Sequence, residues 1–389
     1  MIFKLALRNI VGNGWRSLIS MVVIAIIFIG MIWMEAMYHS WIALAKTQQK
    51  EWEFASGMLR VDEYDPYDAF TWEDSHAPIG PELQSAVELG KAVPMLLSPA
   101  VIYPHQRQLS TLVKGIPHDQ HVLEFPTQKL AGRVEGYIPC VIGAMMAKTT
   151  RLEEGDVFTL RVKDSHGAFN TLDLKLVEIM RIPVPNLDIN TIWMDLDALR
   201  ELKQLPGSAT TVVFQDAELA TLDVEGFRQI TEKEYFSYLD EIMETENFSK
   251  YMIYGLIMFL AMIAIFDTQA LALFKRRKEI GTFSALGMTK RRIIWLFTVE
   301  GALYCVFGII LGALLGLPLF SYFAVRGYVM PEGYEDFGIA GFTYAIKFEY
   351  PPGIILSVVF WLLLITLVVS WFAARRISGL KVTEVLKGK

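Results

Sequence analysis

The sequence is poor in cysteine. Its 389 residues include only two, Cys140 and Cys305. Cys305 lies within a long apolar run, whereas Cys140 lies in a more polar part of the chain, so the two thiols are not expected to meet. A framework of disulfide bonds is therefore excluded as the basis of this fold.

Motifs that bind phosphate or carry hydrolytic chemistry are missing as well. Gly90-Lys91 lacks the upstream glycine and the downstream Ser or Thr of a phosphate-binding loop, and neither G-x-S-x-G nor H-E-x-x-H occurs. His118, His121 and Glu124 are interpreted as part of a solvated loop, because ligand count and context fall short of a metal site. We therefore expect no catalytic, cofactor or metal site in this chain.

Apolar residues, in contrast, are abundant: the chain is 53% hydrophobic and its mean hydropathy is +0.35. About 20 mostly apolar residues suffice for a helix to cross the hydrocarbon core of a membrane. The first apolar run is too long for a signal-peptide core, and bulky residues separate it from the nearest small-residue site, so it is interpreted as an uncleaved anchor. Four runs predict four transmembrane helices: 18–38, 251–274, 293–323 and 354–374.

Positive charge is distributed unevenly around these runs. The short segments 1–17, 275–292 and 375–389 contain three, seven and five Lys and Arg residues. Short segments rich in Lys and Arg stay in the cytoplasm, so we expect both termini and 275–292 there, with the amphipathic segment 1–17 leading into the first span. Segments 39–250 and 324–353 are expected outside. The 19 basic and 33 acidic residues of 39–250 argue against nucleic-acid binding.

The segment 39–250 has the pattern of an α+β domain inserted between the first and second spans. Its two ends, 39–55 and 231–247, predict stalk helices. Alternation in DVFTLRV and LDLKLVEIM, on either side of a polar turn, predicts a hairpin, and TTVVFQD predicts a further strand. TIWMDLDALRELKQL predicts a strand entering a capped helix, and IPCVIGAMMAKTTRL predicts a short helix. The predicted fold class is a membrane α-helical protein with four transmembrane helices and an inserted extracytoplasmic α+β domain.

Three acidic residues interrupt the apolar runs: Glu35, Asp267 and Glu300. A carboxylate within a membrane is costly, so it usually faces a partner helix or a cavity. Glu35 and Asp267 lie near the ends of their runs, where their side chains can reach the interface. For Glu300, a conformational pivot and a hydrogen bond that joins two helices remain alternatives.

The third apolar run has a glycine-rich face. Gly308, Gly312 and Gly316 recur every four residues, and Gly301 precedes them. Small residues at this spacing let another helix approach closely. We therefore expect a packing face with room for one helix to slide on another, and we expect Pro318 to bend or end the helix.

Segment 275–292 is more than a charged loop. Between its basic clusters it reads EIGTFSALGMT, with Phe283, Leu286 and Met288 as apolar contacts and Gly281 and Gly287 as expected helix breakers. A basic loop that touches anionic lipid is the simpler interpretation, but such a loop needs no apolar patch bounded by glycines. We interpret the segment as a short helix that contacts a cytoplasmic protein.

This segment resembles the cytoplasmic signature of FtsX/MacB-type permeases, the membrane subunits of type VII ABC transporters. It departs from that signature at Ser284, where the family usually has a basic residue. The resemblance extends to Glu300-Gly301, to the tail AARRISGLKVTEVLKGK and to CVIGAMMAKTTRLEEGDVFTL in the outer segment. The matching residues of the signature are Arg277-Lys278-Glu279-Ile280-Gly281, Ala285-Leu286-Gly287 and Lys290-Arg291-Arg292.

The resemblance implies a mechanism in which the chain itself is no enzyme. Two permease chains, identical or homologous, would rest on a dimer of separate cytosolic ATPases that bind ATP and Mg²⁺. Closure of the ATPases would move the stalks and the outer, MacB-like periplasmic core domains. The residues implied in ATPase coupling are Arg277, Lys278, Glu279, Ile280, Gly281, Phe283, Ala285, Leu286, Gly287, Met288, Lys290 and Arg291. Those implied in transmembrane packing or pivoting are Glu300, Gly301, Gly308, Gly312 and Gly316.

Within that family the layout is most similar to the lipoprotein-releasing LolC/LolE branch. This similarity implies a bacterial inner-membrane protein that extracts a lipoprotein or another amphiphile from the outer leaflet, with membrane lipid and a periplasmic carrier or adaptor as further partners. The short turn 163–171 departs from the long hook of the carrier-recruiting member. MacB-like efflux of peptides or antibiotics and FtsX-like signalling to a cell-wall hydrolase remain alternatives.

Overall fold

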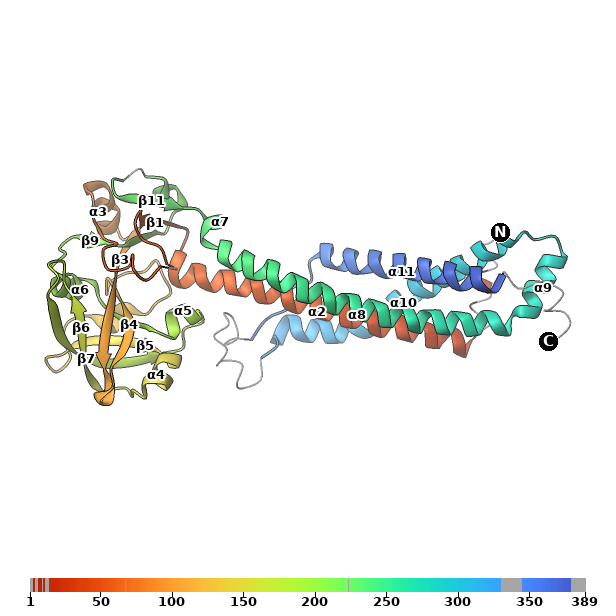
Figure 1. Cartoon of the computed structure of the whole chain (residues 1–389), viewed down its shortest axis with the longest axis horizontal. Coiled ribbons are helices and arrows are strands. Elements are labelled where there is room, and N and C mark those ends of the chain that lie inside the picture. Colours follow the sequence, from red (N-terminus) through yellow and green to blue (C-terminus); the bar gives the residue numbers. More distant parts are fainter. Residues whose placement is uncertain are drawn as a thin grey trace. The chain divides into compact units, whose positions relative to one another are not determined.

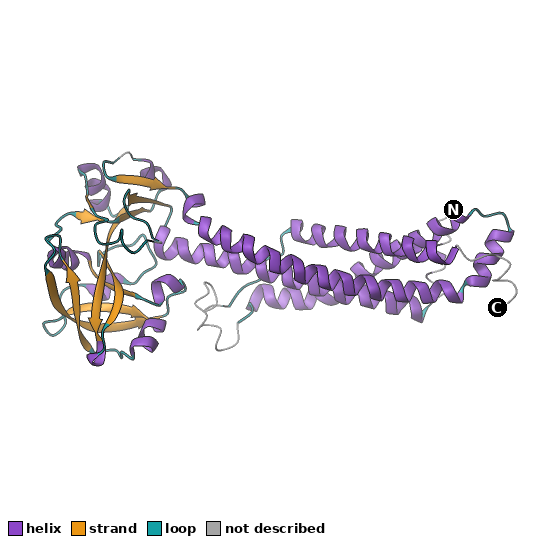
Figure 2. Cartoon of the chain, viewed as in Figure 1, coloured by secondary structure: helices purple, strands orange, loops and turns teal. Residues whose placement is uncertain are grey.

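The computed structural model describes residues 3, 6–8, 10, 14–66, 68–222, 224–329 and 345–378. The chain divides into two compact units. A membrane unit comprises Met1–Ser40, Glu241–Tyr328 and Lys347–Lys389, and an outer unit comprises Trp41–Asp240 and Val329–Ile346. Figure 2 shows that the membrane unit is helical, whereas the strands belong to the outer unit.

Four long helices dominate the chain (Figure 1). They are α2 (Trp15–Gln49), α8 (Ser237–Lys275), α10 (Lys290–Arg326) and α11 (Pro352–Ser378). Each contains an apolar window long enough to cross a membrane, as the four apolar runs predicted. Pro318 lies inside α10 and does not end it, because transmembrane helices tolerate a proline when neighbouring groups satisfy the freed backbone.

The membrane unit is held together by one main apolar cluster. Ile24, Phe28 and Ile32 of α2 meet Leu296 and Leu303 of α10. The cluster continues through Ile265, Val358, Leu362 and Val369, which come from the other two long helices. All four long helices therefore contribute to a single core within this unit.

The outer unit is built on a nine-stranded sheet in the order β11-β1-β10-β3-β4-β8-β5-β7-β6. Because β3 also pairs with β6, the six strands from β3 to β6 close into a barrel. The strands are β1 (Gly57–Val61), β3 (Ala92–Tyr103), β4 (Leu109–Ile116), β5 (Ile138–Gly143), β6 (Val157–Lys163), β7 (Phe169–Met180), β8 (Thr191–Asp195), β10 (Thr211–Phe214) and β11 (Phe227–Ile230). β2 (Ala77–Pro78) and β9 (Ser208–Ala209) form a separate pair.

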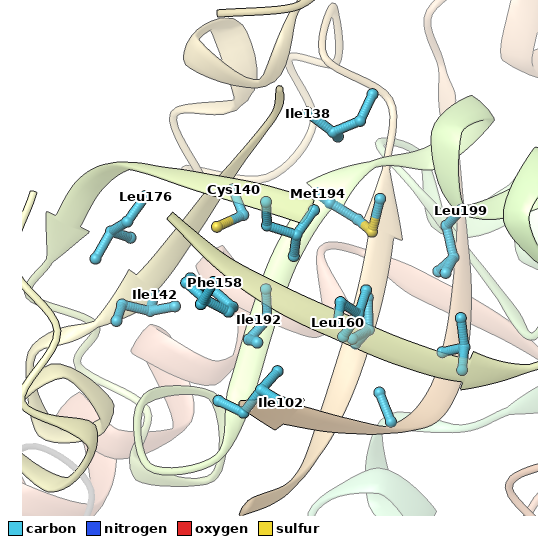
Figure 3. Packing of buried hydrophobic residues seen from close by; sticks show 14 of the residues in the cluster. Ile102, Ile138, Cys140, Ile142, Phe158, Leu160, Leu176, Ile192, Met194 and Leu199 are labelled. Atoms are coloured by element: carbon cyan, nitrogen blue, oxygen red, sulfur yellow. The ribbon is translucent and has the colours of Figure 1, made fainter. Parts of the chain in front are cut away.

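Apolar side chains pack the interior of the barrel. Ile102, Cys140, Leu160, Ile192 and Met194 are buried at its centre (Figure 3). They alternate along their strands with residues that face outwards, as the period of two in a strand requires. Burial raises the pKa of the Cys140 thiol, so this cysteine is a packing residue.

Short helices surround the barrel and the smaller three-strand extension. They are α3 (Pro81–Glu88), α4 (Ala144–Thr150), α5 (Pro185–Asp188), α6 (Leu196–Lys203) and α7 (Glu232–Tyr235). Asp195 caps α6 by accepting a hydrogen bond from the amide of Asp197, and Thr231 caps α7 by accepting one from Glu234. These caps satisfy amides that have no partner within the helix.

Most of the predicted outer elements are confirmed, and one is partly wrong. β6 and β7 form the predicted antiparallel hairpin, and β8 runs into the capped helix α6. The segment predicted as one short helix instead begins as strand β5 and becomes helical only at Ala144. β5 lies between β7 and β8 and is fully buried, so its apolar sequence does not alternate and resembles that of a buried helix.

Candidate functional site

The short helix α9 (Arg277–Ala285) follows α8 and precedes α10. It ends where Gly287 adopts a positive φ of 88°, a conformation that glycine tolerates without strain. Gly281 lies within α9, so the prediction that it breaks the helix is wrong. A glycine inside a helix costs about 1 kcal/mol relative to alanine, and the helix continues through it.

One face of α9 packs against the membrane unit. Ile280, Phe283 and Met288 contact a buried cluster formed by Ile293, Phe297, Ala373 and Ala374 of α10 and α11. Leu286, in contrast, is 80% exposed. The apolar residues of the segment therefore have two roles: most fix α9 to the long helices, and Leu286 is presented to the surroundings.

A buried ion pair fixes the junction of α8 and α9. The side chain of Arg276 is 11% exposed and that of Glu300, on α10, is 6% exposed. Arg276 Nη1 donates to both carboxylate oxygens of Glu300, at 2.9 and 3.1 Å. Its Nε donates to Glu279 on α9 at 2.8 Å, and its guanidinium lies over the ring of Phe297. One guanidinium thus connects α8, α9 and α10.

The same network continues to the beginning of α2. Tyr304, one helical turn after Glu300, donates to its Oε1 at 3.2 Å. The Tyr304 hydroxyl also lies 3.2 Å from Ser17 Oγ, and Ser17 Oγ donates to the Ile10 carbonyl at 2.9 Å. A displacement of α9 would therefore act through polar contacts on both α10 and α2.

The glycines of α10 lie at close helix contacts. A Cβ at Gly308 would lie 2.7 Å from Ile24 Cβ, and one at Gly312 would lie 3.0 Å from the Ala25 carbonyl oxygen, both on α2. A Cβ at Gly301 would collide with Ser370 of α11 and Gln269 of α8. At Gly316 the nearest atoms belong to Phe320 and then to Ile29 of α2.

The other two intramembrane acids have separate surroundings. Glu35 on α2 accepts a hydrogen bond from the Tyr254 hydroxyl of α8 and lies 3.8 Å from Lys250 Nζ. Lys250 also lies over the ring of Tyr38. Glu35 therefore joins α2 to α8, whereas Asp267 is exposed on the surface of the chain.

In the outer unit, the end of α2 and the beginning of α8 are fastened to the barrel at one point. Glu53 lies in a short π-helix, Lys50–Phe54, that follows α2. It accepts from Lys114 of β4 at 2.5 Å and from the Tyr235 hydroxyl of α7 at 2.8 Å. Lys46–Asp240 and Lys50–Glu232 ion pairs lie beside it, at 3.0 and 2.7 Å.

The structure brings some predicted site residues together and leaves others apart. Glu279, Ile280, Phe283, Met288 and Glu300 meet around α9, whereas the exposed side chains of Lys290 and Arg291 lie outside its packed face. The side chains of Arg277, Lys278 and Ala285 lie outside the described residues. Their roles, and that of Leu286, remain predictions.

Arg276 is the residue that the sequence interpretation missed. It was counted only among the basic residues of the segment. The available signal was Glu300, because a carboxylate this far inside an apolar run requires a partner, and the cations of segment 275–292 are the nearest candidates. What the sequence did not indicate is which cation turns inwards.

The triplet of His118, His121 and Glu124 shows no metal-site geometry. His118 Nδ1 lies 2.9 Å from Asp195 Oδ1, and this hydrogen bond raises the pKa of His118. Among the described residues, no three His, Cys, Asp or Glu side chains come together as a metal site would require.

Residues 251–382, which contain α9 and most of the network, match a protein-family model described as "FtsX-like permease C-terminal". This part of the chain is an FtsX-like permease domain. The resemblance to FtsX-type permeases that the sequence of the α9 segment indicated is therefore confirmed, whereas the lipoprotein-releasing branch stays a prediction. This similarity concerns residues 251–382, and the four long helices of the described chain are long and apolar enough to cross a membrane.

Two further proteins are similar to parts of the chain. The "Cell division protein FtsX" of Bacillus subtilis (strain 168) is 38% identical over 88 residues, which are 23% of this chain and 29% of that protein. The extracellular domain of a "noncanonic ABC-type transporter YknZ from Gram-positive bacteria" is 10% identical with a TM-score of 0.27, over 45% of this chain and 99% of that domain. The similarity to the second of these proteins is too low to support an inference about function.

Proposed function

We propose that this chain is the membrane subunit of an ABC transporter in which a separate cytosolic ATPase drives motion of the outer unit. The observation that carries the proposal is the Arg276 network. It joins α9, which the exposed Leu286 directly follows, to two of the long helices. A push on α9 would therefore move α10 and α2 together.

The outer unit supports the second half of this path. Glu53 connects the end of α2 and the residues before α8 to strand β4 of the barrel. Motion of either long helix would act on the barrel through a charged, largely buried contact. ATP and Mg²⁺ would be bound by the partner ATPase, and a second permease chain, identical or homologous, would complete the membrane assembly.

The substrate class favoured here is a lipoprotein or another amphiphile, extracted from the outer leaflet of a bacterial inner membrane. Buried side chains pack together inside the barrel, which favours a mechanical role for it. An outer unit moved by helices can displace a substrate that never crosses the bilayer. Membrane lipid and a soluble carrier or adaptor would be further partners, and both termini would be cytoplasmic.

A second candidate is signalling to a cell-wall hydrolase without transport. The match to a cell-division FtsX protein favours it. The two candidates share the α9 mechanism and differ only in what the outer unit moves. Depletion of the chain in its host separates them: lipoproteins held in the inner membrane indicate extraction, and unseparated cells indicate signalling. Sensitivity to antibiotics would instead indicate MacB-like efflux.

The docking of the ATPase is tested with Leu286→Asp in the full-length chain. Leu286 is exposed, so the substitution should leave the folded state intact while placing a charge in the proposed contact. Leu89→Asp is the matched control, because Leu89 is 73% exposed and lies in the outer unit. We expect Leu286→Asp to abolish copurification of the host ATPase and Leu89→Asp to retain it. Equal ATPase recovery from both variants would refute the docking of α9.

A further inference from the structure

Two arginines occupy directly opposite positions on neighbouring strands of the outer unit, and the proposed mechanism uses neither. β11 is the last strand of the nine-stranded sheet and pairs antiparallel with β1 (Figure 1). In this register Arg60 of β1 lies opposite Arg228 of β11. Like charges directly opposite each other on a sheet are destabilising, so the two guanidinium groups require anions nearby. We call these residues the Arg60–Arg228 pair.

The carboxylate of Glu234, on α7, forms ion pairs with both arginines, but not equally. Arg228 Nη1 donates to Glu234 Oε1 at 2.6 Å. Arg60 Nη2 lies 3.7 Å from the same oxygen, which is beyond the distance of a hydrogen bond. Glu234 therefore satisfies Arg228 and leaves Arg60 with a loose ion pair.

The surroundings of Arg60 leave its charge poorly compensated. Its side chain is only 12% exposed, and its Nε is buried with no hydrogen-bond partner among the described residues. The guanidinium lies over the ring of Tyr64. Burial and the neighbouring Arg228 lower the pKa of Arg60, and the nearby acidic groups do not restore it. A buried charge is normally paired and hydrogen-bonded, so these unused donors indicate a ligand.

The chemistry of the two side chains indicates which ligand fits. The side chains of Arg228 and Glu234 are 39% and 41% exposed, so a small ion can reach them from solvent. A guanidinium presents its N–H donors as a planar fork that matches the oxygens of carboxylates and phosphates. The flat carboxylate of Glu234 brings only Arg228 within hydrogen-bond distance. A phosphate offers more oxygens in a tetrahedral arrangement and can accept from two forks at once.

We propose that the Arg60–Arg228 pair is a binding site for a phosphate group on the outer unit. Each arginine would donate to different phosphate oxygens, and the Glu234 carboxylate would move from Arg228 towards solvent. The negative charge of the phosphate would remove the repulsion between the two opposed cations. The phosphate can be a free ion or part of a phosphodiester such as a glycerophosphate headgroup, and the test separates these two sources.

This inference goes beyond the proposed function and does not rest on it. The site lies wholly within the outer unit and needs no ATPase. Leu286→Asp, which tests ATPase docking, leaves both arginines unchanged, and substitutions at the Arg60–Arg228 pair leave Leu286 unchanged. Failure of one proposal is therefore distinguishable from failure of the other.

The test is a titration of the purified full-length chain in dodecyl maltoside, a detergent without phosphate. The probes are inorganic phosphate and glycerophosphoglycerol, a soluble phosphodiester, each compared with sodium chloride at equal ionic strength because salt screens surface charges. A ligand that binds only the folded state raises the unfolding temperature as its concentration rises, and this dependence gives the Kd. We expect phosphate to raise the unfolding temperature more than chloride or acetate does. The probe with the lower Kd identifies the source of the phosphate group.

Arg60→Met should raise the Kd for phosphate at least about tenfold, as expected when one member of a desolvated charge pair is removed. Arg107→Met is the matched control, because Arg107 is exposed in the same unit, and it should bind phosphate as the native chain does. Arg60→Lys keeps the charge but loses the fork, so its Kd should rise too. This variant decides the matter if Arg60→Met does not fold.

Glu234→Gln should have the opposite effect. Removal of the competing carboxylate should lower the Kd for phosphate at least about threefold, because a like charge no longer opposes the ligand. A purely structural role of Glu234 would not tighten the binding of an anion. The proposal is overturned if phosphate acts no differently from chloride, if acetate binds as tightly as phosphate, if Arg60→Met or Arg60→Lys binds phosphate as well as Arg107→Met does, or if Glu234→Gln weakens binding.

Discussion

Two buried cations, Arg276 and Lys203, have opposite surroundings. Arg276 donates to two carboxylates, and Glu300 and Glu279 keep its pKa above the ordinary value even though burial lowers it. Lys203 has one long hydrogen bond, to a backbone carbonyl. Planar guanidinium groups suit buried bidentate pairs better than ammonium groups do. The first cation should stabilise the fold, and the second should weaken it.

Arg276→Met should destabilise the chain by about 3–5 kcal/mol, the cost of removing one partner of a buried pair. The methionine preserves most of the packing, so the effect reports on the charge left at Glu300. Thermal unfolding of the purified chain in nanodiscs measures it. Arg291→Met is the control, since Arg291 is exposed in the same basic segment.

The pairing itself is isolated by a double-mutant cycle with Glu300→Gln. We expect Arg276→Met combined with Glu300→Gln to lose less stability than the sum of the two single variants. Strict additivity would contradict the direct contact.

Lys203→Met should stabilise the outer unit. Burial lowers the pKa of Lys203 from its ordinary 10.5, so the folded chain releases this proton at a lower pH than the unfolded chain does. Stability therefore rises with pH between the folded pKa and 10.5. The variant should gain about 1–3 kcal/mol and lose this alkaline rise, as measured by unfolding at pH 7 to 10. Lys233→Met, at an exposed position, should change neither the free energy of unfolding nor its rise with pH. A Lys203→Met variant that is less stable than the native chain would contradict the argument.

At the scale of elements, the contact between α2 and α10 depends on the absence of side chains. Gly308 and Gly312 let the backbones approach until a Cβ would touch α2. α9, in turn, is too short to be stable by itself, because isolated helices of fewer than about 12 residues are marginal. Its packing on Ile293 and Phe297 supplies the stability that its length does not.

Gly312→Leu should separate α2 from α10 and cost about 1–3 kcal/mol through overpacking. Gly30→Leu is the matched control, since a Cβ at Gly30 on α2 meets open space. The measurement is thermal unfolding, together with the stimulation of the partner ATPase by the chain. An unchanged unfolding temperature and unchanged ATPase stimulation in Gly312→Leu would show that the glycine face of α10 is not a packing contact.

At the scale of the whole molecule, the unequal distribution of Lys and Arg predicts which side of the membrane each unit faces. Leu286→Cys should react with a membrane-impermeant maleimide only after the cells are permeabilised, and Phe169→Cys should react in intact spheroplasts. The native Cys140 and Cys305 are fully buried and add little background. Labelling of both positions from the same side would contradict the predicted orientation.

Much of the architecture could be predicted from the sequence, because its signals are local. Continuous apolar runs of membrane length, the alternation in β6 and β7 and the cap at Asp195 need no tertiary information. The prediction for β5 was wrong in part, because burial on both faces removes the alternation that identifies a strand. The prediction for Gly281 was wrong because packing of α9 outweighs the small cost of a glycine.

The sequence by itself determined the four apolar helices, the inserted domain and the permease resemblance of segment 275–292, because composition and short motifs carry that information. Only the tertiary structure decided that β3 closes on β6 and that Arg276 pairs with Glu300. These features depend on contacts between residues that are not neighbours in the chain, such as Arg276 with Glu300 and Ile102 of β3 with Leu160 of β6. Charge and hydropathy show that a buried acid needs a partner, but only packing selects the partner.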